Sequence, residues 1–154
     1  MMDHAKWMRE ALKEARKAFR KDEVPVGAVA VYEGKVVARG HNTKETHFDP
    51  TAHAEICCLR KAGQVLKSWR LYGVSFYTTL EPCPMCAGAL IKARVKEVIY
   101  GTRDPKTGSA GSVVNIFRVK KWNHHPAVKG GVLKQECKEI LQKFFKKIRK
   151  RRAL

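Results

Sequence analysis

Apolar residues recur at helical spacing at the start of the chain and then give way to short apolar runs separated by turn residues. Residues 3–21 combine an apolar face with a basic face, which predicts a first helix. The apolar positions of this helix are Met8, Leu12, Ala15 and Phe19. Residues 26–32 and 35–41 flank a Glu33-Gly34 turn and predict a β-hairpin. Residues 42–49 are polar and predict a loop.

The signals for a second helix begin at Asp49. Its carboxylate can cap free backbone amides, Pro50 suits a first helical position, and residues 52–59 are good helix formers. His53 and Glu55 are therefore expected in the first turns, near the positive end of the helix dipole. Gly63 is expected to weaken or end this helix.

The second half of the chain alternates between strand and helix signals. We expect strands at residues 74–80, 95–100 and around 132–133, and helices at 85–93, 113–119 and 134 to about 152, with a loop at 101–112. After an initial hairpin, this alternation predicts an α/β fold, a layered sheet with its site at strand-to-helix turns. No repeat or linker divides the chain, and we expect one domain over residues 1–154 with a basic C-terminal helix.

The charge balance favours a polyanionic partner. Thirty-two Lys and Arg against fourteen Asp and Glu give a formal net charge of +18. Such an excess favours nucleic acid through phosphate neutralisation and counterion release. A basic surface adapted to the conditions of the host is the alternative. The excess is densest in residues 143–152, where Phe144 and Phe145 interrupt the basic run.

The five cysteines are expected to be thiols or metal ligands, because the sequence predicts a reducing compartment. Residues 1–23 are charged and amphipathic, unlike a secretory signal, and no segment is apolar and long enough to span a bilayer. We therefore expect a cytoplasmic protein without membrane association or disulfides. Cys58 and Cys137 are interpreted as small core residues.

Cys83 and Cys86 have the spacing of metal ligands. Two cysteines at i and i+3 can face one ion where a helix opens, and His53 can supply a third ligand. Three protein ligands leave a tetrahedral zinc with one open position, which is the arrangement of catalytic sites. Glu55, two residues after His53, can move protons at that position.

Two other interpretations of these residues remain open. Cys57 lies four residues after His53 and could complete a closed, structural site of three cysteines and one histidine. The protein would then be a non-catalytic, zinc-stabilised RNA-binding module. The Cys83–Cys86 pair could also be a redox pair, although such a pair needs no distant histidine and glutamate.

His-x-Glu followed by Pro-Cys-x-x-Cys is the signature of zinc nucleoside and nucleobase deaminases. Beyond this signature, the chain resembles the bacterial tRNA-specific adenosine deaminases over nearly its whole length. The matching segments are residues 23–28, 49–56, 79–88, 100–108 and 122–124, with Phe144 and Phe145 near the end. His125 departs from the pattern, because we expect arginine there, and we assign it no role.

The resemblance implies a hydrolase that converts adenosine to inosine at the wobble position of the tRNA anticodon. It implies a cytidine-deaminase-like three-layer α/β/α sandwich with a central mixed five-stranded sheet, and a homodimer. One Zn(II) per subunit would be bound by His53, Cys83 and Cys86. Glu55 would take a proton from the water and pass protons to the ring nitrogen and the departing ammonia.

The resemblance also implies a set of substrate contacts. Asn42 would hydrogen-bond the base edge, and Val26 and Ala54 would form part of its pocket. The anticodon stem-loop would be held by Asp104, Lys106, Asn123, Phe144, Phe145 and Arg149. Adjacent phenylalanines cannot share one narrow side of a helix, so one is expected in the core while the other meets a base or the dimer partner. The rival within the superfamily is a free-base or free-nucleotide deaminase acting on guanine or cytosine, which would need no basic terminal helix.

Overall fold

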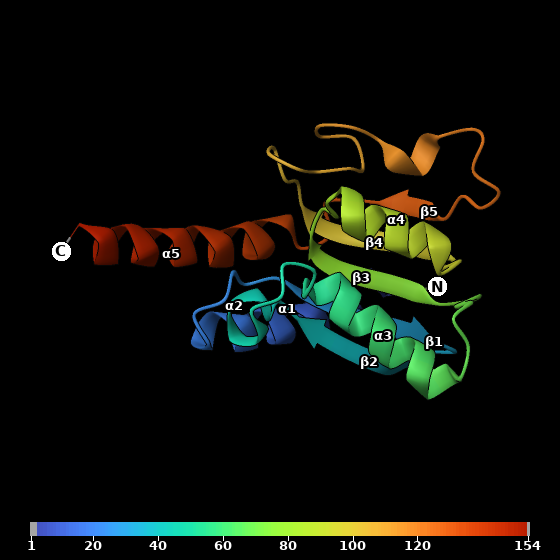
Figure 1. Ribbon diagram of the computed structural model, residues 1–154, viewed down its shortest axis with the longest axis horizontal. Helices are drawn as coiled ribbons and strands as arrows, with labels where there is room; N and C mark the ends of the chain where they lie inside the picture. The colour runs from blue at the N-terminus through green and yellow to red at the C-terminus, as the bar shows by residue number, and fades with distance from the viewer. Residues whose placement is uncertain (1–2, 154) are drawn as a thin grey trace.

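A mixed sheet of five strands lies between two layers of helices in the computed structural model, which describes residues 3–153 (Figure 1). The strands are β1 (Gly27–Tyr32), β2 (Lys35–His41), β3 (Ser75–Leu80), β4 (Glu97–Thr102) and β5 (Ala127–Lys129), in the order β2-β1-β3-β4-β5. β1 runs antiparallel to β2 and β3, whereas β4 is parallel to β3 and β5. The expected three-layer α/β/α architecture is confirmed.

Alternation of side chains along the strands produces the two outer layers, because successive residues point to opposite faces. One face packs against α3 (Ala54–Leu66) and α4 (Pro84–Lys92) through Ala28, Ala30, Phe76 and Val98. The other face packs against α1 (His4–Arg20) and α5 (Lys134–Arg152) through Val29, Val31, Tyr77 and Ile99. Both faces are buried, which explains the continuous apolar runs of the central strands.

Gly40 brings α3 directly onto β2. A Cβ atom at this position would lie 2.6 Å from the Ala54 carbonyl oxygen and 2.6 Å from the Cys58 backbone nitrogen. No larger residue fits without moving the helix away from the strand. The beginning of α3, where His53 and Glu55 lie, is thereby fixed against the sheet.

The predicted beginning of the second helix at Asp49 is wrong. α3 begins at Ala54, and His53 is its N-cap residue. The Asp49 carboxylate instead accepts hydrogen bonds from the Thr51 amide at 2.8 Å and the Thr51 hydroxyl at 2.7 Å, closing a turn before the helix. Aspartate competes in this way because it can bond to nearby amides in non-helical backbone. The helix also continues through Gly63 to Leu66.

Three further segments differ from the sequence-based expectations. The strand expected around residues 132–133 lies at Ala127–Lys129, and Leu133 adopts left-handed backbone (φ 51°), which ends any strand there. The helix expected at 113–119 shortens to a single 3₁₀ turn, η1 (Ile116–Arg118). The loop expected at 42–49 contains the short helix α2 (Lys44–His47).

The last helix, α5, begins on the sheet and projects beyond the body of the molecule towards the C-terminus (Figure 1). Its first turn packs Cys137 into the layer beside β4, and Phe144 meets Phe19 of α1 with ring centroids 6.1 Å apart. No helix within residues 3–153 is long and apolar enough to cross a membrane.

Glu14 is a buried carboxylate between α1 and β2, and its hydrogen bonds stabilise the ionised form. Burial raises its pKa, but hydrogen bonds from His41 and Lys17 outweigh burial and lower the pKa to about 2 from an ordinary 4.5. The Glu14 side chain is only 4% exposed, so solvent screens these interactions little.

We expect Glu14→Gln to lower the free energy of unfolding at pH 7 by about 1–3 kcal/mol, because the amide cannot replace an ionised acceptor. The folded-state pKa lies below the ordinary value, so this stabilisation is complete above about pH 5 and is lost as pH falls towards 2. Urea denaturation of both proteins between pH 7 and pH 3 should show the difference shrinking. A difference that stays constant with pH would contradict the assignment.

Candidate metal and substrate site

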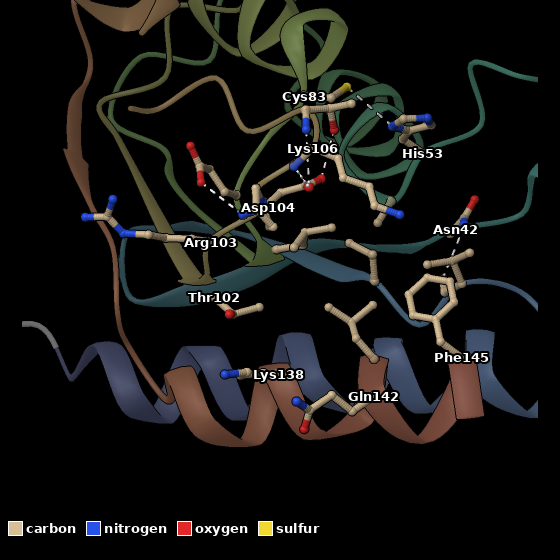
Figure 2. A pocket seen from close by; sticks show the side chains of 18 of the residues that line it. Asn42, His53, Cys83, Thr102, Arg103, Asp104, Lys106, Lys138, Gln142 and Phe145 are labelled. Atoms are coloured by element: carbon tan, nitrogen blue, oxygen red, sulfur yellow. Dashed lines mark hydrogen bonds between the residues drawn. The ribbon is translucent and has the colours of Figure 1, made fainter. Parts of the chain in front are cut away.

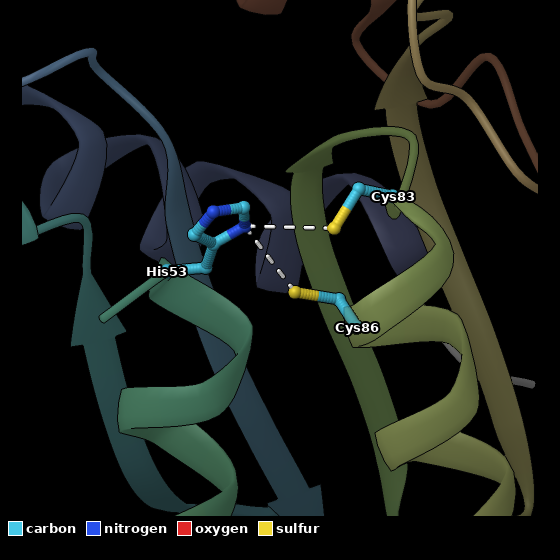
Figure 3. Close-up of side chains that lie close together, drawn as sticks. All are labelled: His53, Cys83 and Cys86. Carbon is cyan, nitrogen blue, oxygen red and sulfur yellow. Dashed lines mark hydrogen bonds between the residues drawn. The ribbon is translucent and has the colours of Figure 1, made fainter. Parts of the chain in front are cut away.

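Two helix beginnings bring the predicted metal ligands together. His53 is the N-cap residue of α3, and Cys83 is the N-cap residue of α4, with Cys86 in the first turn of that helix. Figure 3 shows the imidazole of His53 facing both sulfur atoms across the gap between the two helices. The free amides and dipoles at both helix ends favour thiolate at this place.

The distances between the three side chains suit a tetrahedral zinc. His53 Nδ1 lies 3.6 Å from Cys83 Sγ and 3.5 Å from Cys86 Sγ, and the three ligand atoms are all within 4.8 Å of one another. A zinc with bonds of about 2.05 Å to nitrogen and 2.3 Å to sulfur places these ligands about 3.6 Å apart. The group therefore fits a metal ion without rearrangement.

The chemistry of the thiols also fits a metal ligand. A hydrogen bond from Cys86, together with the nearby His53, lowers the pKa of Cys83 to about 4. Its ligand form, the thiolate, is therefore favoured at neutral pH. The same hydrogen bond and burial raise the pKa of Cys86.

Cys57 is not part of this group. Among residues 3–153, the cluster with metal-ligand spacing contains His53, Cys83 and Cys86. The Cys57 sulfur instead lies 3.7 Å from the Thr43 hydroxyl. This placement favours three protein ligands over the closed site of three cysteines and one histidine.

Glu55 lies beside the metal ligands and is buried, with 4% of its surface exposed. Burial, with a contribution from the charge of Cys83, raises its pKa to about 7. A carboxyl group with a pKa near neutrality can both accept and donate a proton under ordinary conditions.

A cavity of about 590 Å³ opens from His53, Glu55 and Cys83 towards α5 (Figure 2). This volume lies within the range of pockets that hold small ligands. The residues predicted to contact substrate that line it are Val26, Asn42, Ala54, Asp104, Lys106, Phe145 and Arg149. They come from the segment before β1, the segment after β2, the first turn of α3, the loop after β4 and α5, so distant parts of the chain meet around one space.

Asn42 is held in place in the wall of the cavity. It is 4% exposed, its amide group donates to the Val24 carbonyl at 3.3 Å, and its amide oxygen accepts from the Lys44 backbone nitrogen at 3.2 Å. Glu23 fixes the same segment, because its buried carboxylate accepts hydrogen bonds from the Glu45 and Thr46 amides at 3.0 and 2.7 Å. Glu23 therefore secures one wall of the cavity.

Phe144 and Asn123 lie outside the cavity, unlike the other residues predicted to contact substrate. Phe144 is 4% exposed and packs against Phe19, whereas its neighbour Phe145 is 45% exposed and lines the cavity. Packing on α1 therefore takes Phe144 into the core and leaves Phe145 on the cavity side. Asn123 is exposed in the loop that leads to β5.

Lys138 and Gln142 also line the cavity, and the sequence did not single them out. They precede Phe145 and Arg149 on α5 at spacings of three and four residues, so all four share one side of the helix. The spacing of these residues relative to Phe145 and Arg149 was the one signal in the sequence that could have indicated their place at the cavity. It was not enough, because polar residues on an exposed helix usually face only solvent.

His125, which departs from the expected pattern, is close to a backbone carbonyl. Its Nε2 lies 2.8 Å from the Val119 carbonyl oxygen, and the Trp122 indole donates to the Ile116 carbonyl at 2.8 Å. Both contacts shape the loop between η1 and β5.

Sequence comparison shows similarity to deaminases over almost the entire chain. The MafB19-like deaminase family matches residues 2–149. A tRNA-specific adenosine deaminase of Bacillus subtilis (strain 168) is 47% identical over 146 residues, covering 95% of this chain and 91% of that protein. A tRNA-specific adenosine deaminase of Agrobacterium fabrum is 45% identical over 149 residues, covering 97% of this chain and 98% of that protein.

Solved structures of deaminases are also similar to this chain. One from studies of A-to-I editing by tRNA:A34 deaminases at the wobble position of transfer RNA has a TM-score of 0.85 and 46% identity, covering 88% of this chain and 99% of that chain. Guanine deaminase from Bacillus subtilis has a TM-score of 0.63 and 40% identity over 66% of each chain. The similarity to the first structure thus extends over more of this chain.

We expect the cobalt(II)-substituted protein to show charge-transfer absorption from two thiolate ligands, since two sulfurs face the site. Cys83→Ser should weaken this absorption and lower the zinc content measured by atomic absorption. Cys57→Ser is the matched control and should change neither. Loss of absorption in Cys57→Ser would instead support the closed, structural site of three cysteines and one histidine.

Proposed function

The chain belongs to the deaminase family that includes the tRNA-specific adenosine deaminases, and from this we propose that it hydrolyses adenosine to inosine at the wobble position of a tRNA anticodon. The observation that carries the proposal is one cavity joining the His53, Cys83 and Cys86 group to α5. The reaction consumes water and releases ammonia. The metal group and buried Glu55 support the chemistry, and α5 supports the choice of an RNA substrate.

We propose that His53, Cys83 and Cys86 bind one zinc ion per subunit. When bound, zinc supplies a Lewis acid that makes water a nucleophile at neutral pH. The two sulfurs and one nitrogen are ligands that zinc prefers, and their mutual distances fit its tetrahedral geometry.

Glu55 is the proposed proton carrier. Its carboxylate takes a proton from the water that replaces the amino group, and protons pass from it to the ring nitrogen and to the departing ammonia. Burial supports this role, because it raises the pKa of Glu55 to about 7 and so brings both protonation states within reach. Glu55 also lines the cavity, where it can reach a bound base.

Asn42, Val26 and Ala54 are proposed to hold the adenine. The Asn42 amide carries both a donor and an acceptor, and its fixed orientation suits recognition of a base edge. Val26 and Ala54 supply apolar surface beside it. Anticodon-loop bases are single-stranded and enter such a pocket at less cost than a paired base.

Residues at the outer end of the cavity are proposed to hold the flanking nucleotides. Phe145 offers a ring for base stacking, and Lys106 and Arg149 offer positive charge to phosphate. Asp104 and Asn123 are proposed to meet ribose hydroxyls. Phe144 serves the site indirectly, by anchoring α5 on Phe19.

The free-base alternative draws support from the likeness to guanine deaminase. The α5 wall of the cavity favours RNA instead, since a free base needs neither Phe145 nor the basic residues that follow it.

We also propose a cytoplasmic homodimer. Val113 and Val114, which are 53% and 47% exposed after β4, leave apolar surface that a second subunit could cover.

Glu55→Ala is expected to retain zinc and fold but to lower inosine formation at least about 1,000-fold, because proton transfer depends on this carboxylate. The assay is incubation with an anticodon stem-loop carrying adenosine at the wobble position, followed by nucleoside analysis. Glu139→Ala, at an exposed position on α5, is the control. Comparable inosine yield from Glu55→Ala would show that the catalytic assignment is wrong, and ammonia release only from free bases would favour the alternative.

The outward face of α5 provides a second prediction. Lys143, Lys146 and Lys150 are exposed there, whereas Lys147 and Arg151 pair with Asp22. Replacing the three exposed lysines by glutamine should reduce the slope of log Kd against log salt for tRNA by about 2. A matched triple replacement of Lys35, Lys67 and Lys96, exposed at the opposite end of the sheet, should leave the slope nearly unchanged. Equal changes in both triples would indicate a non-specific effect of net charge.

A further inference from the structure

Glu81 is a carboxylate with 1% of its surface exposed, between the end of β3 and the turn that carries Cys83. One of its oxygens, Oε1, accepts from the Asp104 amide at 3.0 Å and from the Ser112 hydroxyl. The other, Oε2, accepts from the Ala110 amide at 2.9 Å and the Ser112 amide at 3.1 Å. Four donors from the loop after β4 thus converge on one side chain.

The backbone around Glu81 reinforces this connection. The Glu81 amide donates to the Thr102 carbonyl at 2.9 Å, and the Ser109 amide donates to the Pro82 carbonyl at 2.8 Å. The approach is so close that a Cβ atom on Gly108 would lie 2.5 Å from the Glu81 carboxylate. The loop after β4 is therefore wrapped around Glu81 and contacts the metal-ligand turn directly.

The same loop forms a wall of the substrate cavity through Arg103, Asp104, Lys106 and Thr107. The Asp104 carboxylate stiffens it by accepting from the Lys106 amide at 2.9 Å and the Thr107 hydroxyl at 2.8 Å. A continuous series of contacts therefore leads from Cys83 through Glu81 and Asp104 to Lys106.

We propose that Glu81 is a positioning residue that fixes the outer wall of the cavity relative to the metal ligands, and so determines how well an RNA substrate is held. This inference rests on the proposed function and names a further residue for it. Glu81 does not itself carry protons in this assignment, because loop donors occupy both of its oxygens. Its effect on the reaction passes through Asp104 and Lys106.

Glu81→Gln tests one connection selectively. The amide oxygen can remain opposite the Ala110 and Ser112 amides, which both need an acceptor. The amide nitrogen then faces Asp104 and Ser112, and the Ser112 hydroxyl can rotate to accept from it. Only the Asp104 amide is left without an acceptor. The substitution therefore loosens the cavity end of the loop while the far end stays attached.

We expect Glu81→Gln to raise KM for the anticodon stem-loop about tenfold, with kcat within about threefold of wild type and zinc content unchanged. Hydrogen exchange should become faster in residues 103–107 but not in the Cys83 turn. Ser112→Ala, which leaves all three amide contacts to Glu81 in place, should keep KM within about twofold. Glu14→Gln, another buried carboxylate on α1, should lower stability without raising KM.

Glu81→Asp provides a second test if the glutamine variant does not fold. It keeps the acceptor-only carboxylate but is one methylene too short to reach both groups of donors, and the same rise in KM is expected. Unchanged KM in both variants, or loss of zinc from either, would overturn the inference. Absence of inosine formation by the wild-type protein would instead refute the proposed function, whereas the hydrogen-exchange comparison would still test the connection through Glu81.

Discussion

The site exists because two helices begin at the same end of the sheet, where the strands β2 and β3 finish. β2 ends at His41 opposite Gly27, and Ala28 pairs with Thr78 near the end of β3, so the chain leaves both strands at that end. From there it enters α3 with His53 and α4 with Cys83 and Cys86. Gly40 allows the first helix to lie directly on its strand. The distances between His53, Cys83 and Cys86 depend on this backbone arrangement, since each of these residues lies on or beside a helix end.

Two buried carboxylates hold the walls of the cavity in fixed positions relative to His53, Cys83 and Cys86. Glu23 and Glu81 are each 1% exposed; Glu23 accepts hydrogen bonds from amides of the short helix α2, and Glu81 accepts them from amides of the loop after β4. Bonds to a charged acceptor are stronger than those between neutral groups, and leaving the carboxylate unsatisfied would be costly. The short helix α2 and the loop after β4 thereby acquire fixed positions around a site that has to accept a flexible substrate.

The sequence predicted which side chains lie together better than it predicted the boundaries of the elements. His53, Cys83 and Cys86 were expected in one group from the spacing of the cysteines and the signature residues, and the structure brings them within 4.8 Å of one another, with Glu55 lining the same cavity. The beginning of α3 was missed since Asp49 caps its own turn. β5 was missed because its three residues are exposed at the sheet edge, while the more apolar Val132 and Leu133 form a turn. Lys138 and Gln142 could not be assigned, because only the tertiary position of α5 shows that their side of the helix faces a cavity.

α5 shows why stability and substrate choice cannot be separated in this chain. Cys137 sits so close to β4 that a Cβ on Gly101 would lie 2.4 Å from its sulfur, and Phe144 anchors the next turns on α1. These contacts fix the rotation of the helix about its axis. The rotation places Phe145 and Arg149 on the cavity side and leaves Lys143, Lys146 and Lys150 exposed to solvent. A substitution that repacks Phe144 would therefore turn both functional faces, even though Phe144 lines no part of the cavity.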